Sequence, residues 1–374
     1  MGKSILIFAL SRNPWIGGIY YKKNILHMLL SNPGIREKYR FVVLTNSKYR
    51  DVFSCFEKEK GAKVTIVTCS GKINPIRALL QVILCWLKYS VVYVFPIKPY
   101  RFLKLLGITP VSWIADFQHN HYPGFFEQAE ISKRNADFVF IARSDNPLIL
   151  SSEDALEDFR KYYSSKRENV HVVHFTSFIQ DELQRMNALD YGAVLEKYGL
   201  RENTYAVVCN QFWQHKNHKL VLEALKALET SHPDFCYTIV MTGEPNDRRN
   251  PGYIDEIKKL VEDPWVSEHT KILGFIDRIE QLCIISHAGF VIQPSLFEGW
   301  GTVLEDAKVL GKKVLLSDIP VHREQMDENC ALFSVEGCRA LAELIFDESK
   351  KPHQAVYLLD KTGEYSKELA RVFV

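Results

Sequence analysis

Short apolar segments rich in β-branched residues alternate with helical or polar segments along the whole chain, and this alternation is what most constrains the fold. Continuous apolar runs are typical of buried parallel strands, and strands that alternate with helices imply a parallel, doubly wound sheet. The predicted fold class is therefore α/β, with the strands in two series. The first series covers residues 4–10, 41–45, 63–67, 91–95, 110–114, 138–142 and 170–175. The second covers residues 205–210, 236–242, 270–275, 289–294 and 312–317.

The two series predict two domains, for which 374 residues are sufficient. The alternation lapses over residues 186–203, which read as an interdomain helix ending in a glycine turn. We expect an N-terminal Rossmann-like domain over 1–185, a linker over 186–203 and a C-terminal Rossmann-like domain over 204–374. Whether the final segment crosses back to the first domain is open. If the two sheets face each other across a cleft, the loops after their strands will meet one ligand.

Composition indicates an ordinary globular protein and excludes collagen-like or disordered classes, since 47% of residues are hydrophobic and 25% are charged. The eight cysteines show no CxxC pair, and no secretory signal precedes them. We therefore expect a reduced, cytoplasmic compartment.

One apolar stretch, residues 79–97, is long enough to cross a bilayer, but Lys88 interrupts it and Pro96 closes it. We interpret it as a helix over residues 76–87 followed by the strand over 91–95. A transmembrane segment is the alternative.

Charge is distributed unevenly along the chain. Residues 1–130 hold 18 basic and 7 acidic side chains, whereas the remainder holds 29 and 38. This asymmetry predicts a basic face for an anionic partner, either a phosphorylated substrate or an anionic membrane surface. No nucleic-acid-binding motif accompanies it, so a nucleic-acid partner is not expected.

Residues 294–325 carry the most specific chemical signal in the chain. They read as a strand end, a glycine-rich loop, a helix over 302–310, a stop at Gly311 and a new strand. Backbone amides from Gly299 to Val303 would then point out of a helix N-terminus, which suits a diphosphate. Thr302 and Asp306 share one helix face, and Glu298 beside the amides can accept hydrogen bonds from sugar hydroxyls.

This segment resembles the signature of the retaining family 4 (group 1) glycosyltransferases, enzymes with two Rossmann-like domains in the GT-B fold. The resemblance implies that Glu298 contacts the donor sugar. It also implies that a carboxylate eight positions later holds the nucleotide ribose. Asp306 occupies that position and Glu305 precedes it, so either could serve. The donor-binding residues expected in this segment are Gly299, Trp300, Gly301, Thr302, Val303, Glu305 and Asp306.

Residues 210–225 resemble the family's strand-to-helix segment in which a basic pair grips the donor phosphates. Lys216 matches the lysine, whereas Asn210 stands where an arginine is common, so Lys216, with His215, would carry more of the leaving-group charge. Gly17 and Gly18 follow the first strand, where the family has a glycine pair near donor phosphate and acceptor. A tight turn that needs a positive φ is the alternative explanation for these glycines.

His119 follows the strand over 110–114, where the resemblance implies a histidine that contacts the donor sugar near its anomeric carbon. A histidine with a satisfied ring is the alternative, and Asp116 would either cap the loop or orient His119. Neither Asp116, His119 and His121 nor His215 and His218 show a recognised zinc pattern, so no metal site is expected.

Three basic or histidine-containing groups carry weaker signals. Arg248 and Arg249 follow a strand of the second series and would contact nucleotide or form a solvated loop. Lys98, Arg101 and Lys104 would bind phosphate or lipid headgroups, or form a solvated face. His322 and Arg323 are expected to serve local structure.

The resemblance implies transfer of a sugar, of the hexosyltransferase type, from a nucleotide diphosphate sugar to an acceptor hydroxyl, with retention. We expect no metal and no cofactor beyond that co-substrate. Glu298, His119 and Lys216 are the expected catalytic residues. The expected acceptor is a glycan or a lipid-linked sugar in polysaccharide, lipopolysaccharide or other glycoconjugate assembly. The expected location is the cytoplasm, with a peripheral position at the inner face of the membrane as an alternative. Two other functions stay open: a GT-B nucleotide-sugar 2-epimerase and a non-catalytic nucleotide-sugar-binding protein.

Overall fold

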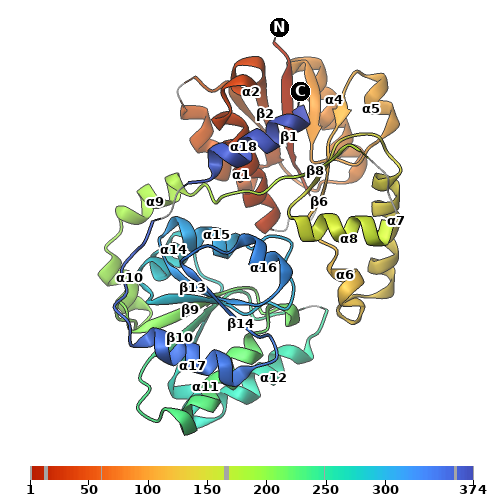
Figure 1. Ribbon diagram of the computed structural model, residues 1–374. Coiled ribbons are helices and arrows are strands. Elements are labelled where there is room, and N and C mark those ends of the chain that lie inside the picture. Colours follow the sequence, from red (N-terminus) through yellow and green to blue (C-terminus); the bar gives the residue numbers. More distant parts are fainter. Residues whose placement is uncertain are drawn as a thin grey trace. The chain divides into compact units, whose positions relative to one another are not determined.

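The computed structural model describes residues 2–11, 16–59, 61–163, 168–247, 249–357 and 360–373 (Figure 1). Its chain divides into two compact units. The first unit comprises Met1–Phe117, Ala129–Phe178 and Asp360–Val374, and the second comprises Gln118–Gln128 and Ile179–Leu359. The chain therefore passes between the units more than once.

The main sheet of the first unit is parallel, with strand order β3-β2-β1-β4-β5. Successive strands are added on one side of β1 and then on the other, so the order reverses between β1 and β4. Such a reversal opens a crevice at the carboxyl ends of the strands. The strands are β1 (Ser4–Ala9), β2 (Arg40–Asn46), β3 (Val64–Cys69), β4 (Val91–Phe95) and β5 (Thr109–Pro110).

Helices α4 and α5 cover one face of this sheet, where Val82 and Leu103 pack in one cluster with Leu6 and Val94. Helix α4 begins with Pro75 after the N-cap Asn74, whose side chain accepts a hydrogen bond from the Arg77 amide at 2.8 Å. The helix predicted over 76–87 is confirmed. The helices of this sheet are α1 (Ile16–Ser31), α2 (Pro33–Lys38), α3 (Arg50–Phe53), α4 (Pro75–Tyr89), α5 (Arg101–Leu105) and α18 (Thr362–Ala370).

No helix in the part of the chain that the structure describes has the length and apolar character needed to span a membrane.

The segment predicted as one strand over 110–114 is divided between β5 and β6, which belong to different sheets. The second, parallel sheet of the first unit has the order β6-β7-β8. Its strands are β6 (Ser112–Ile114), β7 (Leu148–Leu150) and β8 (Val170–Val172), and its helices are α7 (Gln128–Ala142) and α8 (Glu153–Tyr163).

The strand predicted over 138–142 is wrong, because these residues end helix α7. Phe138 and Ile141, three positions apart, pack against Leu148, whereas Val139 and Phe140 between them are partly exposed. The apolar run thus spans two helix faces, and the strand of this region is the shorter β7.

The second unit contains a six-stranded parallel sheet with the order β11-β10-β9-β12-β13-β14. Its residues alternate between two cores. Ala206 and Val208 pack with α11, α12, α13 and α17, whereas Val207 and Val291 pack with α9, α10, α14 and α15. The two helix layers lie on opposite faces of the sheet (Figure 1). The predicted doubly wound parallel sheets in separate domains are therefore confirmed.

The strands of the second unit are β9 (Tyr205–Cys209), β10 (Thr238–Thr242), β11 (Thr270–Gly274), β12 (Phe290–Gln293), β13 (Lys313–Ser317) and β14 (Cys330–Phe333). Its helices are α6 (Gln118–His121), α9 (Gln180–Asn187), α10 (Tyr191–Lys197), α11 (His218–Ser231), α12 (Gly252–Val261), α13 (Pro264–Glu268), α14 (Arg278–His287), α15 (Thr302–Val309), α16 (Pro320–Gln325) and α17 (Cys338–Ser349). Short 3₁₀ helices η1 to η5 cover Ser47–Tyr49, Ser54–Lys58, Pro123–Phe125, Gln214–Lys216 and Arg371–Phe373.

The observed division of the chain differs from the predicted boundaries at 185/186 and 203/204. The predicted linker contains α10, whose Leu195 is buried in a core of the second unit. The final segment groups with the first unit. There the Tyr39 hydroxyl donates a buried 3.0 Å hydrogen bond to the Phe373 carbonyl, and Thr176 and Thr362 join their hydroxyls at 2.7 Å.

Candidate functional site

Polar side chains collect at the carboxyl ends of three neighbouring strands of the second unit. Asn210 follows β9, Gln293 ends β12 and Ser317 ends β13. The strand order reverses between β9 and β12, so these residues lie at the crevice where ligands bind in open α/β sheets. Buried polar groups at such an edge need partners, and here they bond to one another.

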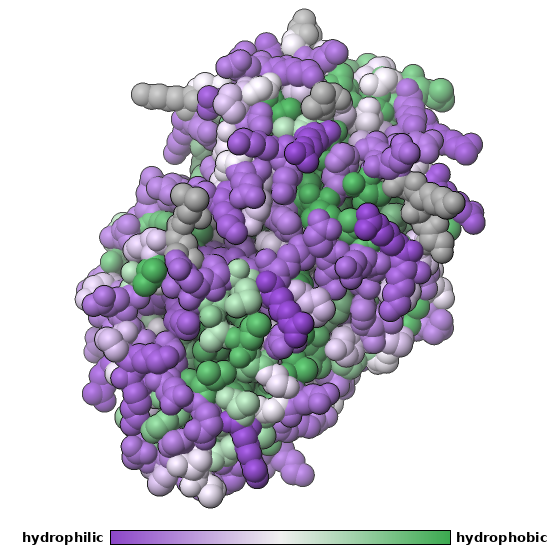
Figure 2. All heavy atoms as spheres, viewed as in Figure 1, coloured by the Kyte–Doolittle hydropathy of each residue, from purple (hydrophilic) through white to green (hydrophobic). Residues whose placement is uncertain are grey.

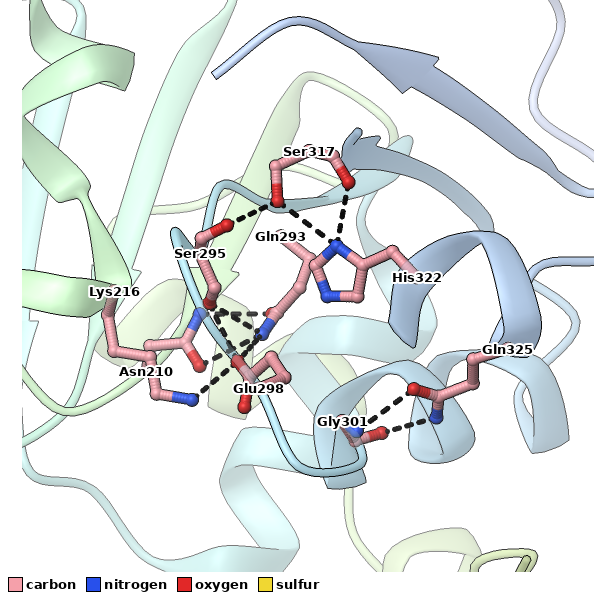
Figure 3. Close-up of polar contacts among 9 residues, drawn as sticks. All are labelled: Asn210, Lys216, Gln293, Ser295, Glu298, Gly301, Ser317, His322 and Gln325. Carbon is pink, nitrogen blue, oxygen red and sulfur yellow. Dashed lines mark hydrogen bonds and ion pairs between the residues drawn. The ribbon is translucent and has the colours of Figure 1, made fainter. Parts of the chain in front are cut away.

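Lys216 and Glu298 form the centre of this cluster (Figure 3). The Lys216 Nζ lies 2.6 Å from Glu298 Oε1, with side-chain exposures of 14% and 9%. The same oxygen accepts hydrogen bonds from Gln293 Nε2 at 2.8 Å and Ser295 Oγ at 2.7 Å. Among the described residues, none donates to the other oxygen, Oε2, which therefore has acceptor capacity for a ligand.

The surroundings keep Glu298 ionised. Burial alone would raise the pKa of its carboxyl group, but the Lys216 ammonium and the Ser295 hydroxyl favour the carboxylate, and the pKa falls to about 2. Glu298 therefore carries a negative charge at neutral pH. The sequence prediction placed Lys216 and Glu298 in one site from segments 82 positions apart, and the structure brings them into direct contact.

Asn210 faces the interior of this cluster. Its side-chain Nδ2 donates to Gln293 Oε1 at 3.0 Å, and the residue is 5% exposed. Asn210 thereby orients the Gln293 amide that donates to Glu298. The donor contact predicted for Asn210 stays a prediction.

His322 is a member of the site that the sequence analysis assigned to local structure. It is fully buried, and its Nδ1 lies 2.8 Å from the Ser317 carbonyl oxygen, while the Ser317 hydroxyl donates to the Ser295 carbonyl at 2.5 Å. Burial lowers the pKa of His322, so the ring is neutral at pH 7. Its Nε2 has no hydrogen-bond partner among the residues that the structure describes. A neutral ring with Nδ1 as the donor leaves Nε2 as an acceptor.

Helix α15 begins at Thr302, directly after the N-cap Gly301. The prediction that all amides from Gly299 to Val303 face a ligand is wrong for Gly301. Its N–H donates to Gln325 Oε1 at 2.9 Å, and its carbonyl accepts from Gln325 Nε2 at 2.9 Å. By helix geometry, the N–H groups of Thr302 and Val303 still lack an intrahelical carbonyl.

Glu305 and Asp306 are both buried, at 3% and 0% exposure, but they face different neighbours. Glu305 Oε1 accepts from Gln325 Nε2 at 2.8 Å and from Lys308 Nζ at 3.2 Å. Burial raises the pKa of Glu305, although Lys308 opposes the effect. Glu305 therefore belongs to the interior contact between α15 and α16.

Asp306 instead pairs with Arg278, the first residue of α14, whose Nη2 lies 2.7 Å from Asp306 Oδ1. Both charges act on the thiol of Cys209 at the end of β9. Asp306 thus lies on the side of α15 that meets the carboxyl edge of the sheet.

His215 lies beside Lys216 in η4 (Gln214–Lys216) and is 6% exposed. Burial, and then the Lys216 ammonium, holds the pKa of His215 well below its usual range. A neutral His215 would contribute a hydrogen bond rather than a positive charge to a diphosphate, and its donor contact stays a prediction. Its carbonyl accepts a 2.7 Å hydrogen bond from the Leu296 amide, which fixes the loop that carries Glu298.

The predicted histidine segment lies on α6, within the second unit. The His121 ring lies 5.2 Å from that of Phe297, and the Tyr122 hydroxyl donates to the Leu296 carbonyl at 3.3 Å. The segment that carries the buried His119 therefore packs against the loop before Glu298. Asp116 pairs with Arg134 at 3.4 Å. The sugar contact of His119 stays a prediction.

Gly17 and Gly18 lie in the first turn of α1. Because helical residues have negative φ, the alternative of a tight turn with positive φ is wrong. The four residues that precede α1 lie outside the described part of the chain. The phosphate contact predicted for the two glycines stays a prediction.

Among the weaker predictions, Arg249 has its guanidinium between two aromatic rings, 5.0 Å from Phe126 and 5.2 Å from Trp213. Arg248 lies outside the described residues. Lys98 forms a 2.5 Å ion pair with Asp137, whereas Arg101 and Lys104 are exposed.

Across the described ranges, no three His, Cys, Asp or Glu side chains are arranged to hold a metal ion.

Comparison with known proteins agrees with this geometry. Residues 195–362 match the family described as "Glycosyl transferases group 1". A D-inositol 3-phosphate glycosyltransferase of Jonesia denitrificans is 24% identical over 180 residues, which cover 46% of this chain and about two fifths (41%) of that relative.

Solved structures resemble the whole chain in fold. Anabaena HepE in complex with UDP and glucose superposes with a TM-score of 0.67 at 14% identity, covering 99% of this chain and 96% of that one. The UDP-GlcNAc 2-epimerase of Methanocaldococcus jannaschii reaches 0.53 at 12% identity, covering 100% and 99%. At these identities the likeness shows the fold alone.

Proposed function

We propose, from the match of residues 195–362 to the group 1 glycosyltransferases, that this protein transfers a sugar from a nucleotide diphosphate sugar to an acceptor hydroxyl. The observation that carries the proposal is the Lys216–Glu298 pair at the strand-order reversal of the second unit. It places a cation and a carboxylate with one uncommitted oxygen side by side. A diphosphate and a sugar hydroxyl are the groups that such a pair would bind.

Catalysis would be mainly electrostatic. As the bond between sugar and phosphate opens, negative charge grows on the departing diphosphate. Lys216 would stabilise this charge together with the N–H groups of Thr302 and Val303. The Lys216–Glu298 ion pair would hold the ammonium in place before the donor binds, so little reorganisation is needed during the reaction.

The sugar would be oriented by Glu298 Oε2 and His322 Nε2, which both accept hydrogen bonds. Glu298 lies in the loop between β12 and α15 and His322 lies on α16, and the Ser295–Ser317 contact joins them. Two fixed acceptors would recognise two hydroxyl groups of one sugar. His119 would contact the sugar near its anomeric carbon.

Of the two candidate ribose carboxylates, we favour Asp306. It lies at the carboxyl edge of the sheet with Arg278, whereas Glu305 is engaged by Gln325 and Lys308 in the interior. Asp306 would accept a ribose hydroxyl while Arg278 neutralises it.

The finer parts of the proposal concern stereochemistry, metal and acceptor. We propose retention at the anomeric carbon, activity without a metal ion, and no cofactor besides the donor. The acceptor would be a glycan or lipid-linked sugar in polysaccharide, lipopolysaccharide or other glycoconjugate assembly, used in the cytoplasm.

The first test is a thermal-shift panel of UDP-, GDP-, ADP-, CDP- and dTDP-sugars, each with EDTA. A ligand that binds only the folded protein at ~100 times its Kd stabilises it by about 2.7 kcal/mol. Stabilisation by one nucleotide class, followed by transfer of its sugar with retained configuration by NMR, is the expected result. Absence of any shift would contradict the donor site, and activity abolished by EDTA would contradict metal independence.

A 2-epimerase is the second candidate, because the fold also matches the UDP-GlcNAc 2-epimerase. Incubation of the bound donor without acceptor separates the two activities. An epimerised sugar would support the second candidate, whereas an unchanged donor that is consumed only with acceptor would support transfer. Donor binding without consumption under either condition would indicate a non-catalytic binding protein.

A further inference from the structure

Helix α4 of the first unit is apolar on two opposite faces. Val82 and Cys85 point into the core beneath the sheet. A helix that is apolar all round is ordinarily buried on all sides, in a protein core or in a membrane. In α4 only one face is covered.

The outer face of α4 forms what we name the α4 stripe: Ile76, Leu80, Leu84 and Leu87. These side chains are 74%, 53%, 55% and 66% exposed. Their spacing of four, four and three positions aligns them along the helix. On the neighbouring α5, Leu105 is 87% exposed.

Helices α4 and α5 pack on the same face of the sheet, through the buried side chains of one cluster. In Figure 2, apolar atoms are visible among polar ones at the edge of the first unit where α4 and α5 lie.

The segment of the chain that contains α4 and α5 carries positive charge alone. Residues 61–115 contain seven Lys or Arg residues and no Asp or Glu. Lys88 lies near the C-terminal end of the stripe, and Arg101 and Lys104 are exposed on α5. Lys98 is neutralised by Asp137 of α7. Lys88, Arg101 and Lys104 thus share two helices with exposed apolar side chains, which is the pattern of helices that lie in the interface of an anionic bilayer.

We infer that the α4 stripe docks the first unit on an anionic lipid surface, with the leucines in the acyl boundary and Arg101 and Lys104 among the headgroups. Helix α4 has 15 residues and one buried face, so it would lie in the plane of the membrane. A second copy of this chain is a less suitable occupant. Twofold pairing of the same surface would bring its cations against their own copies.

The test is flotation of the full chain with vesicles of phosphatidylcholine containing about one third phosphatidylglycerol, beside vesicles of phosphatidylcholine alone. We expect the wild type to float with the anionic vesicles only, and less at high salt. The variant L80Q/L84Q should lose binding by about tenfold or more, because two apolar contacts with the acyl boundary are removed. The variant R101Q/K104Q should bind more weakly and with less salt dependence.

A matched control is L189Q, which changes a 40% exposed leucine of the second unit and should bind as the wild type does. Unchanged circular dichroism of each variant checks folding. The inference is overturned if the wild type does not float or floats equally with neutral vesicles. It is likewise overturned if the L80Q/L84Q variant floats as well as the wild type. It is also overturned if the wild type dimerises through the stripe instead, seen as a change of mass that L80Q/L84Q abolishes.

The assay needs neither donor nor acceptor, so its failure would leave the proposed sugar transfer untouched.

Discussion

The ammonium group of Lys216 lies 2.6 Å from Oε1 of Glu298, although 82 residues separate them in the chain. Lys216 is held by the 3₁₀ turn before α11, and Glu298 by the loop between β12 and α15. Each side chain neutralises the charge of the other, which would otherwise be unpaired in a nearly buried site. The pair is therefore expected to act as a unit.

Removing either partner should severely impair sugar transfer. We expect E298Q and K216M each to lower kcat/KM by about 100-fold or more. K216M removes the cation that stabilises the leaving diphosphate, and E298Q removes the carboxylate that holds this cation and orients the sugar. The double variant should cost much less than the product of the two single effects. Steady-state kinetics with the donor identified by thermal shift measures this.

The matched controls are K219M and E256Q, which remove an exposed ion pair between α11 and α12. Their kcat/KM should stay within about twofold of wild type, since exposed pairs contribute little. Near wild-type activity of E298Q would place the donor elsewhere.

The pH dependence of stability should also depend on Glu298. Its pKa is lowered from 4.5 to about 2, so its contribution is fully present above about pH 4.5 and is lost as the pH falls toward 2. The shift corresponds to about 3 kcal/mol. Urea unfolding at pH 6 and pH 3 should show a smaller acid loss in E298Q than in the wild type. Equal losses would mean that the folded-state pKa of Glu298 is ordinary.

Gln325 should be a stability determinant of the α15 N-terminus. Its amide makes two hydrogen bonds with Gly301 and one with Glu305. We expect Q325L to lower the free energy of unfolding by about 1–3 kcal/mol, because the buried Gly301 N–H is left unsatisfied. Urea denaturation measures the loss, with R323Q on the same helix as a control that should change it little, because its ion pair with Asp318 is exposed. A Q325L variant as stable as wild type would show that this N–H finds another partner.

The Arg278–Asp306 ion pair should contribute to the stability of the second unit. R278M should destabilise the protein by about 3–5 kcal/mol, because a buried carboxylate loses its partner, whereas R278M/D306L should recover most of the loss. Urea unfolding of the two variants is the measurement.

Calorimetric titration of the donor separates the two carboxylates of α15. D306N should weaken binding about tenfold, and E305Q should leave it within about twofold, since hydrogen bonds to charged groups are worth about 1.5–3 kcal/mol. The reverse order would assign the ribose to Glu305.

Much of the fold follows from local sequence pattern. Strands such as β4 and β13 are continuous apolar runs, and α4 starts at an Asn-Pro cap. The pattern gave a wrong prediction where an apolar run belongs to a helix instead of a strand. Residues 138–142 have strand-like composition but end α7, and the three-residue β7 is too short to give a periodic signal.

The site was predictable only where its residues lie in local segments with a recognisable pattern. Glu298 and Lys216 belong to recognisable local segments. Gln325 and His322 end the same segment of residues 294–325, but no local pattern marked their roles. These roles depend on packing, which brings Gln325 to Gly301, 24 positions away, and buries His322 against Ser317 at the end of β13. The choice between Glu305 and Asp306 needed the direction of each side chain on α15, which depends on what packs around that helix.

Helix α18 lies beside α1 and completes the first unit, as shown by the Asn32 Nδ2 contact with the Ser366 carbonyl at 3.5 Å and the bond from Tyr39 to Phe373. During synthesis, these residues leave the ribosome only after the entire second unit has emerged. The second unit can therefore fold while the first still lacks one of its helices, which reverses the usual N-terminal-first order. A nascent chain stalled before residue 360 would leave uncovered the side of α1 on which α18 packs.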